Sequence, residues 1–221
     1  MKKYRFFSAL MAVVLSLALL PAPAAALDDP DIQAQHVILL DGNYDEVLYD
    51  KAGEEKAYPA SITKVMTALL VMEAIDAGQM TADTMITASE TSQQGLSIYG
   101  STQNIKPGET MSVKDLLYCL LVPSANEAAN ILAEAVDGSV EEFVAHMNRK
   151  AGELGCQGTH FVNPHGLHSD DHYTTALDLA HIVKAAMEYD LFRQIVYTSV
   201  YETAATNMSA PRTFYNTNGL I

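Results

Sequence analysis

Ser61 and Lys64 stand three positions apart in the segment Ser61-Ile62-Thr63-Lys64. Residues at this spacing lie on one helical face, so the hydroxyl and the amine can meet across a single turn. A serine hydroxyl becomes a good nucleophile when a base takes its proton, and a lysine acts as that base only when it is neutral. The spacing therefore indicates a serine nucleophile with a lysine base. The competing interpretation is a helix cap at Ser61 and a solvated lysine at Lys64.

The segment that follows favours the catalytic interpretation. We expect a helix over residues 61–77, and between Val65 and Met72 only Thr67 is polar. A helix that is apolar on nearly all sides belongs in the centre of a domain. Lowering the pKa of a lysine from about 10.4 to about 7 takes roughly 4 to 5 kcal/mol, which burial supplies only where no acid pairs with the amine. No acidic residue lies within four positions of Lys64, so the sequence favours a neutral amine.

A second hydroxyl and an amide occur in Ser124-Ala125-Asn126, directly after Pro123. Ser124 is suited to relay a proton to a leaving group, and the Asn126 amide is suited to hold Lys64 and to bind a substrate carbonyl. An equally good explanation exists for Ser124, because Glu127 three positions later completes a capping box at a helix start. Both interpretations of Ser124 stay open at this point.

Other segments predict the elements that must position these groups. We expect a β-hairpin from residues 36–41 and 46–50, a strand at 84–88, a turn at 106–109 and an extended segment at 197–204. Capping boxes predict further helices that begin at Ser112 and Ser139, and a last helix is expected over 175–189. Because no repeat or second-domain boundary is evident, we expect one domain.

The composition excludes some classes of function. The chain of 221 residues has 13 Lys and Arg against 27 Asp and Glu, a formal net charge of −14. A nucleic acid is bound by clustered basic side chains, so we expect no nucleic-acid partner. With 49% hydrophobic and 18% charged residues, the chain is expected to be globular rather than disordered.

Residues 1–26 are predicted to be a secretory signal peptide. Basic residues precede the apolar run Phe6–Leu20, and small residues in the A-x-A pattern follow at 21–26. The alternative is an uncleaved membrane anchor, but a spanning helix needs roughly 20 apolar residues. We therefore expect residues 27–221 to form the mature domain, exported to the cell-wall side of the cytoplasmic membrane. How it attaches to the membrane stays open.

The chain has two cysteines, Cys119 and Cys156. Export permits a disulfide between them. Cys119, however, lies in the apolar run 116–122, where a free cysteine packs as a small hydrophobic residue. We therefore expect two unpaired thiols.

Four histidines and two aspartates gather within 13 residues and suggest a zinc site as an alternative: His160, His165, His168, Asp170, Asp171 and His172. The segment lacks the H-E-x-x-H pattern or a similar helical spacing, and its Pro164-His165-Gly166 stretch is typical of a loop. We expect neither a metal nor a cofactor.

Ser61-Ile62-Thr63-Lys64, followed 63 residues later by Ser124-Ala125-Asn126, resembles the first two motifs of serine penicillin-binding proteins and β-lactamases. The likeness is greatest to the D-alanyl-D-alanine carboxypeptidases among the S11 peptidases. Further segments carry it: 58–60, 123–129, 159–167, 173–176 and 178–180.

The resemblance implies a mixed α/β (α+β) fold, with an antiparallel sheet packed against helices and a mostly helical subregion. It implies removal of the terminal D-alanine from peptidoglycan stem peptides through an acyl-enzyme on Ser61, with Lys64 as the general base. Ser124 would complete the proton relay, Asn126 would bind substrate, and β-lactams would acylate the same serine. No cofactor is implied.

The chain departs from the family pattern at the third motif, Lys-Thr-Gly, which lines the oxyanion site. No such triplet is present, and the last lysine is Lys184. We therefore expect a C-terminally incomplete chain that is inactive on its own, since loss of that donor lowers the rate by on the order of 10² to 10³ even before substrate binding is weakened. The alternatives are a non-catalytic wall-binding or penicillin-sensing module, and a β-lactamase. The β-lactamase is disfavoured because no E-x-x-x-N follows Ser124, as class A enzymes would suggest.

Overall fold

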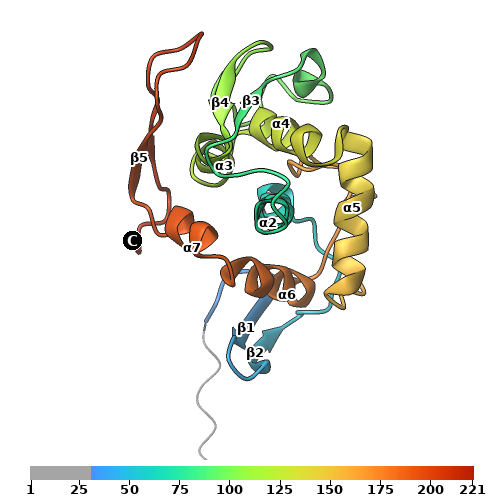
Figure 1. Ribbon diagram of the computed structural model, residues 1–221. Helices are drawn as coiled ribbons and strands as arrows, with labels where there is room; N and C mark the ends of the chain where they lie inside the picture. The colour runs from blue at the N-terminus through green and yellow to red at the C-terminus, as the bar shows by residue number, and fades with distance from the viewer. Residues whose placement is uncertain (1–30) are drawn as a thin grey trace, which may run out of the picture. The chain divides into compact units, whose positions relative to one another are not determined.

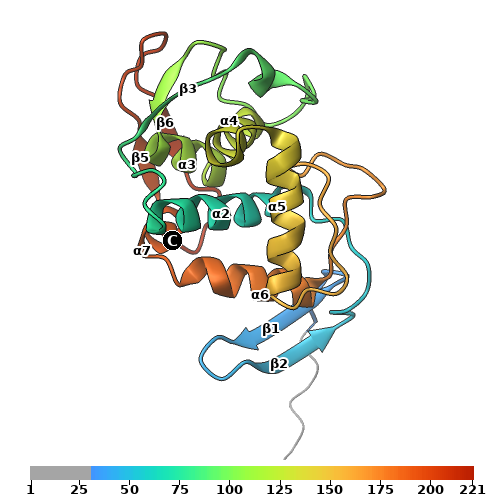
Figure 2. The same cartoon turned by 45° about the vertical axis from the view of Figure 1, so that its right-hand side comes forward.

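Helix α2 (Lys64–Asp76) runs through the middle of the helical region, with the other α-helices of the described residues packed against it (Figure 1 and Figure 2). Nine of its 13 side chains are buried, which confirms the predicted central helix. Its beginning differs from the prediction, because Ala60–Thr63 form a 3₁₀ turn and the α-helix starts only at Lys64. The first three residues of the Ser61–Lys64 motif therefore lie outside the buried α-helix.

The computed structural model describes residues 31–221, so the predicted signal peptide lies outside the described residues. All named elements belong to one unit, residues 35–221. The remaining helices are α3 (Val113–Leu121), α4 (Asn126–Asp137), α5 (Val140–Glu153), α6 (Ala176–Met187) and α7 (Asp190–Val196), with a 3₁₀ turn at Glu90–Gln93. The strands are β1 (Val37–Asp41), β2 (Glu46–Lys51), β3 (Met85–Thr87), β4 (Thr110–Ser112), β5 (Val200–Glu202) and β6 (Thr213–Tyr215).

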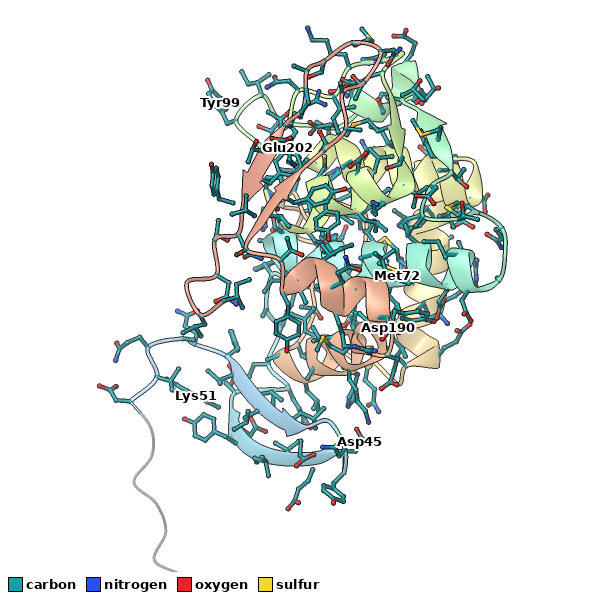
Figure 3. The ribbon with its side chains drawn as sticks, turned by 60° about the vertical axis from the view of Figure 1, so that its left-hand side comes forward. Asp45, Lys51, Met72, Tyr99, Asp190 and Glu202 are labelled. Atoms are coloured by element: carbon teal, nitrogen blue, oxygen red, sulfur yellow. The ribbon has the colours of Figure 1, made fainter. Side chains whose placement is uncertain are left out.

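The six strands within residues 31–221 form three antiparallel pairs, β1 with β2, β3 with β4 and β5 with β6. The β1–β2 pair is the predicted N-terminal hairpin, and β1 packs against α6. Asp45 lies at the tip of this hairpin (Figure 3). It forms an ion pair with Lys184 of α6. Strands packed against helices confirm the predicted mixed α/β fold.

Two of the predicted helix starts are confirmed in atomic detail. The Ser112 hydroxyl accepts a hydrogen bond from the Asp115 amide at 3.0 Å. The Ser139 hydroxyl accepts one from the Glu142 amide at 3.1 Å. These side chains satisfy amide hydrogens that have no partner within the helix.

The C-terminal part differs from the sequence prediction in two respects. The helix expected over 175–189 ends at Met187, and a separate helix α7 follows after Tyr189, whose backbone is extended. Buried Phe192 and Ile195 hold α7 against the core, a tertiary contact that local pattern did not reveal. The extended segment expected at 197–204 forms a strand only at Val200–Glu202.

Cys119 and Cys156 are both unpaired, as expected. Cys119 is 0% exposed within the hydrophobic core, where it packs as a small apolar side chain. None of the helices within residues 31–221 is both long enough and apolar enough to cross a membrane.

Candidate active site

The amine of Lys64 lies at the centre of the candidate site. It contacts the Ser61 hydroxyl oxygen at 3.2 Å, the Asn126 side-chain oxygen at 2.8 Å and the His165 backbone oxygen at 2.7 Å. Lys64 is only 2% exposed, although it occupies the first turn of a helix. The structure thus places the amine against three oxygen atoms from three separate segments of the chain.

Ser61 reaches this amine from the 3₁₀ turn at Ala60–Thr63. In a 3₁₀ turn, side chains three positions apart eclipse one another, which aligns Ser61 directly with Lys64. Ser61 itself is exposed, while Lys64 below it is buried. A substrate in solvent can therefore reach the hydroxyl, while the amine stays shielded from water.

Burial lowers the pKa of Lys64 from 10.5 to about 8, and the negative charge of Glu127 partly opposes this decrease. Glu127 lies 63 positions away in the sequence, so local inspection of the Lys64 segment could not reveal it. At pH 7 a group with this pKa is neutral in roughly one molecule in ten. The free base is thus a minor but accessible form near neutral pH.

The loop that supplies the His165 carbonyl is fixed from several sides. The Asn163 side-chain oxygen accepts hydrogen bonds from the amides of His165 and Gly166, and the Thr67 hydroxyl of α2 donates to the Pro164 carbonyl at 2.6 Å. This carbonyl was not predicted as part of the site, because any residue could provide a backbone oxygen. The only sequence signal was the 159–167 segment of the family resemblance.

Ser124 does not cap helix α4, so the capping-box interpretation is wrong. The helix begins at Asn126 with Ala125 at the cap position, and Ser124 has a positive φ of 65°. Its hydroxyl oxygen is buried and has no hydrogen-bond partner among the described residues. The Glu127 carboxylate instead accepts hydrogen bonds from the Thr102 hydroxyl at 2.8 Å and the Gln103 amide at 2.6 Å.

Asn126 is fixed from its backbone as well as from Lys64. Its amide donates to the Ser101 carbonyl at 3.0 Å, which ties the start of α4 to the loop over residues 93–104. A cavity of about 400 Å³ lies between this loop and Asn126. The exposed Tyr99 projects from the same loop (Figure 3). The site therefore has open space beside the amide that was predicted to bind substrate.

The histidine-rich segment does not form the alternative zinc site. Both ring nitrogens of His172 are engaged, with the Thr63 hydroxyl at 2.8 Å and the Val162 amide at 3.1 Å. A ring nitrogen of His165 accepts from the Leu167 amide, and burial with the nearby Lys64 charge lowers the pKa of His165 to about 4. Within residues 31–221, the six side chains of this segment bring no three ligand atoms within reach of one metal ion.

The sequence of this chain is similar to those of known peptidases. The family model for D-alanyl-D-alanine carboxypeptidases, peptidase family S11, matches residues 23–221. The D-alanyl-D-alanine carboxypeptidase DacF of Bacillus subtilis is 36% identical over 98% of this chain and 56% of its own length. DacA of Escherichia coli is 31% identical over 76% of this chain and 44% of its own length.

Solved structures give the same result for the fold. The Streptomyces K15 DD-transpeptidase superposes with a TM-score of 0.79 at 29% identity, over 88% of this chain and 77% of its own. Penicillin binding protein 5 of Haemophilus influenzae gives a TM-score of 0.80 at 30% identity, over 88% and 55%. The chain spans about half the length of the curated relatives that it matches. It belongs to the D-alanyl-D-alanine carboxypeptidase family, the S11 peptidases.

Proposed function

We propose that the protein is a serine-type D-alanyl-D-alanine carboxypeptidase that removes the terminal D-alanine from peptidoglycan stem peptides. Ser61 is the nucleophile, Lys64 the general base, Ser124 the relay to the leaving group and Asn126 a substrate-binding amide. The observation that carries the proposal is the set of three contacts made by the buried Lys64 amine.

Those contacts explain why the hydroxyl proton of Ser61 moves to the Lys64 amine. The backbone oxygen of His165 and the side-chain oxygen of Asn126 can only accept hydrogen bonds, so they bind two N–H groups of Lys64 whether the amine is charged or neutral. The third contact, to Ser61, changes with charge. A charged amine donates to the hydroxyl oxygen, whereas a neutral amine turns its lone pair toward the hydroxyl hydrogen. Loss of one proton from Lys64 therefore converts Ser61 from an acceptor into a donor that is ready to be deprotonated.

The reaction then proceeds in two steps. The Ser61 oxygen bonds to the carbonyl carbon of the D-alanyl-D-alanine peptide bond while its proton passes to Lys64. The peptide bond breaks, and the leaving amine of D-alanine receives a proton through the Ser124 hydroxyl, which is buried and unpartnered in the described structure. Water hydrolyses the resulting ester and releases the shortened peptide and free Ser61.

The location and inhibitors follow from the same proposal. Residues 1–26 direct export, and residues 27–221 belong to a peptidase domain on the cell-wall side of the membrane, where its substrate lies. A β-lactam presents a strained amide in place of the D-alanyl-D-alanine bond, so penicillins acylate Ser61. The structural neighbour from Haemophilus influenzae is a penicillin binding protein, which supports this inhibitor class.

The experiment is intact-mass analysis of the full-length protein after incubation with benzylpenicillin. We expect the mass of one penicillin on Ser61, and no adduct in Ser61→Ala or Lys64→Ala. Ser199→Ala and Lys56→Ala are matched controls, because both side chains are exposed and neither contacts the Lys64 amine. They should label like the parent protein. Labelling that survives Ser61→Ala would exclude the proposed nucleophile, and rapid turnover of penicillin would favour a β-lactamase.

A further inference from the structure

Three potential metal ligands converge where α5 ends and α6 begins: Cys156, Asp178 and His181. Their ligand atoms all lie within 4.8 Å of one another. Asp178 and His181 are one turn apart on α6 and thus share a helical face, while Cys156 comes from the loop after α5. None of the three contributes to the hydrogen bonds around the Lys64 amine.

His181 of this cluster has a buried ring nitrogen, Nδ1, without a hydrogen-bond partner in the described structure. Buried side-chain nitrogens are nearly always paired, because an unpaired one loses its hydration without compensation. A bound cation would supply the missing interaction.

The other two ligands, Asp178 and Cys156, each keep an atom that can bind a metal ion. Asp178 is 5% exposed, and its Oδ2 atom accepts from the Gly158 amide at 2.8 Å and the Thr159 hydroxyl at 2.7 Å. Its Oδ1 atom has only a long contact, 3.3 Å from the Gln157 amide. The Cys156 thiol is unpaired and makes one weak contact, 3.6 Å from the Asp178 carbonyl. The structural bonds of Asp178 thus use one oxygen and leave the other available.

The cluster also has an open side. Asp178 and His181 line a cavity of about 330 Å³, together with the exposed carboxylate of Glu54 and with Thr175. A metal ion held by three protein ligands would keep a fourth position facing this cavity, where water or Glu54 can bind. Three ligands with an open fourth position are typical of zinc sites that are not purely structural.

We propose that Cys156, Asp178 and His181 bind a zinc ion. A thiolate, an imidazole and a carboxylate form a mixed S, N and O donor set, which suits zinc, whereas Ca²⁺ and Mg²⁺ prefer oxygen ligands alone. Tetrahedral bonds of roughly 2.0 to 2.3 Å require ligand atoms about 3.3 to 3.8 Å apart. The three ligand atoms lie within 4.8 Å of one another, so each pair needs to approach by no more than about 1.5 Å. The thiol proton is released to solvent as the Cys156–zinc bond forms.

The test uses the full-length protein, freed of metal with a chelator and titrated with Co²⁺ as a spectroscopic substitute for zinc. We expect one equivalent to bind, with the visible absorption of four-coordinate cobalt and a thiolate-to-cobalt charge-transfer band. Zinc should displace the cobalt and raise the melting temperature. Cys156→Ala should remove the charge-transfer band, and His181→Gln should weaken binding at least about 10-fold, since loss of even a supporting group costs that much.

Controls separate this site from other histidines and thiols. His146→Gln removes a histidine that pairs with Asp137 elsewhere, and it should bind cobalt like the parent protein. Cys119 remains in every variant and is fully buried, so it contributes no thiolate signal. Six-coordinate cobalt without the charge-transfer band, or equal binding by the parent protein and the Cys156→Ala, His181→Gln double variant, would overturn the proposal. Neither readout depends on acylation of Ser61.

Discussion

Gly166 packs directly on the backbone of Ala60, the residue before the proposed nucleophile. A Cβ atom on Gly166 would lie 1.8 Å from the Ala60 carbonyl oxygen and 3.0 Å from the Ser61 amide nitrogen. The loop that binds Lys64 and the turn that carries Ser61 are therefore fitted to each other at a contact that admits no side chain.

This contact predicts a specific loss in Gly166→Ala. Gly166 has a positive φ of 87°, and Gly78 has one of 73° but no atom within 4 Å of an added Cβ. Gly78→Ala should therefore report the cost of backbone strain alone, about 1 kcal/mol in the free energy of unfolding. Gly166→Ala should lose roughly 1 to 3 kcal/mol more and acylate slowly, because the turn must shift. Urea unfolding and penicillin acylation rates measure both effects, and equal losses in the two variants would contradict the close fit.

Ser124→Ala distinguishes a relay residue from a helix cap. A cap replaced by alanine typically costs about 1 kcal/mol. Ser124 caps no helix and its hydroxyl has no partner in the described structure, so the substitution should change the free energy of unfolding by less than about 0.5 kcal/mol. Turnover of a D-alanyl-D-alanine peptide should nevertheless fall by about 10² or more.

The confirmed cap at Ser139 provides the matched control. Ser139→Ala should lose about 1 kcal/mol and keep full activity. Thermal or urea unfolding, combined with release of free D-alanine, compares the two variants. If Ser124→Ala proved as destabilising as Ser139→Ala and remained active, Ser124 would be a structural residue.

The rate of acylation should follow the charge of Lys64. Only the neutral amine accepts the Ser61 proton, so the rate should rise about tenfold per pH unit below pH 8 and level off above it, given a pKa of about 8. The Glu127 carboxylate raises the pKa of Lys64, so Glu127→Gln should move the whole profile to lower pH. Stopped-flow acylation by a chromogenic β-lactam measures the profile. A flat profile between pH 6 and pH 9 would exclude Lys64 as the base.

The same pKa makes a prediction about stability. The unfolded chain binds a proton at Lys64 up to about pH 10.5, whereas the folded chain releases it from about pH 8. Between these values the unfolded state holds more protons, so stability rises with pH. Relative to Lys64→Met, which carries no titrating group, the free energy of unfolding should increase from pH 8 to pH 10.5 by up to roughly 3 kcal/mol. A constant difference between the two proteins would show that burial does not lower the pKa of this amine.

The sequence predicted those parts of the site that depend on local spacing. Ser61 and Lys64 meet because they are three positions apart, and Lys64 is buried because the helix that it begins is apolar on nearly every side. The first hairpin and the caps at Ser112 and Ser139 follow from similarly local rules, whereas the mixed fold was predicted from the family resemblance.

Contacts between distant segments could not be predicted in this way. The His165 carbonyl contacts Lys64 although the two residues are 101 positions apart in the sequence. Every residue has a backbone oxygen, so residue type cannot reveal such a contact. Ser124 and Glu127 match a capping box by spacing, yet tertiary packing holds Ser124 at positive φ and directs Glu127 to the loop at residues 102–105. The separate helix α7 likewise exists because Phe192 and Ile195 reach the core.

The most direct test of the proposed mechanism is the titration of the Lys64 side chain itself. In full-length protein labelled with carbon-13 lysine, the Cε resonance of Lys64 is identified as the one missing from the NMR spectrum of Lys64→Met. This resonance should show a single titration with a pKa of about 8. A Lys64 amine that stays fully charged up to pH 10 would contradict its role as the base for Ser61.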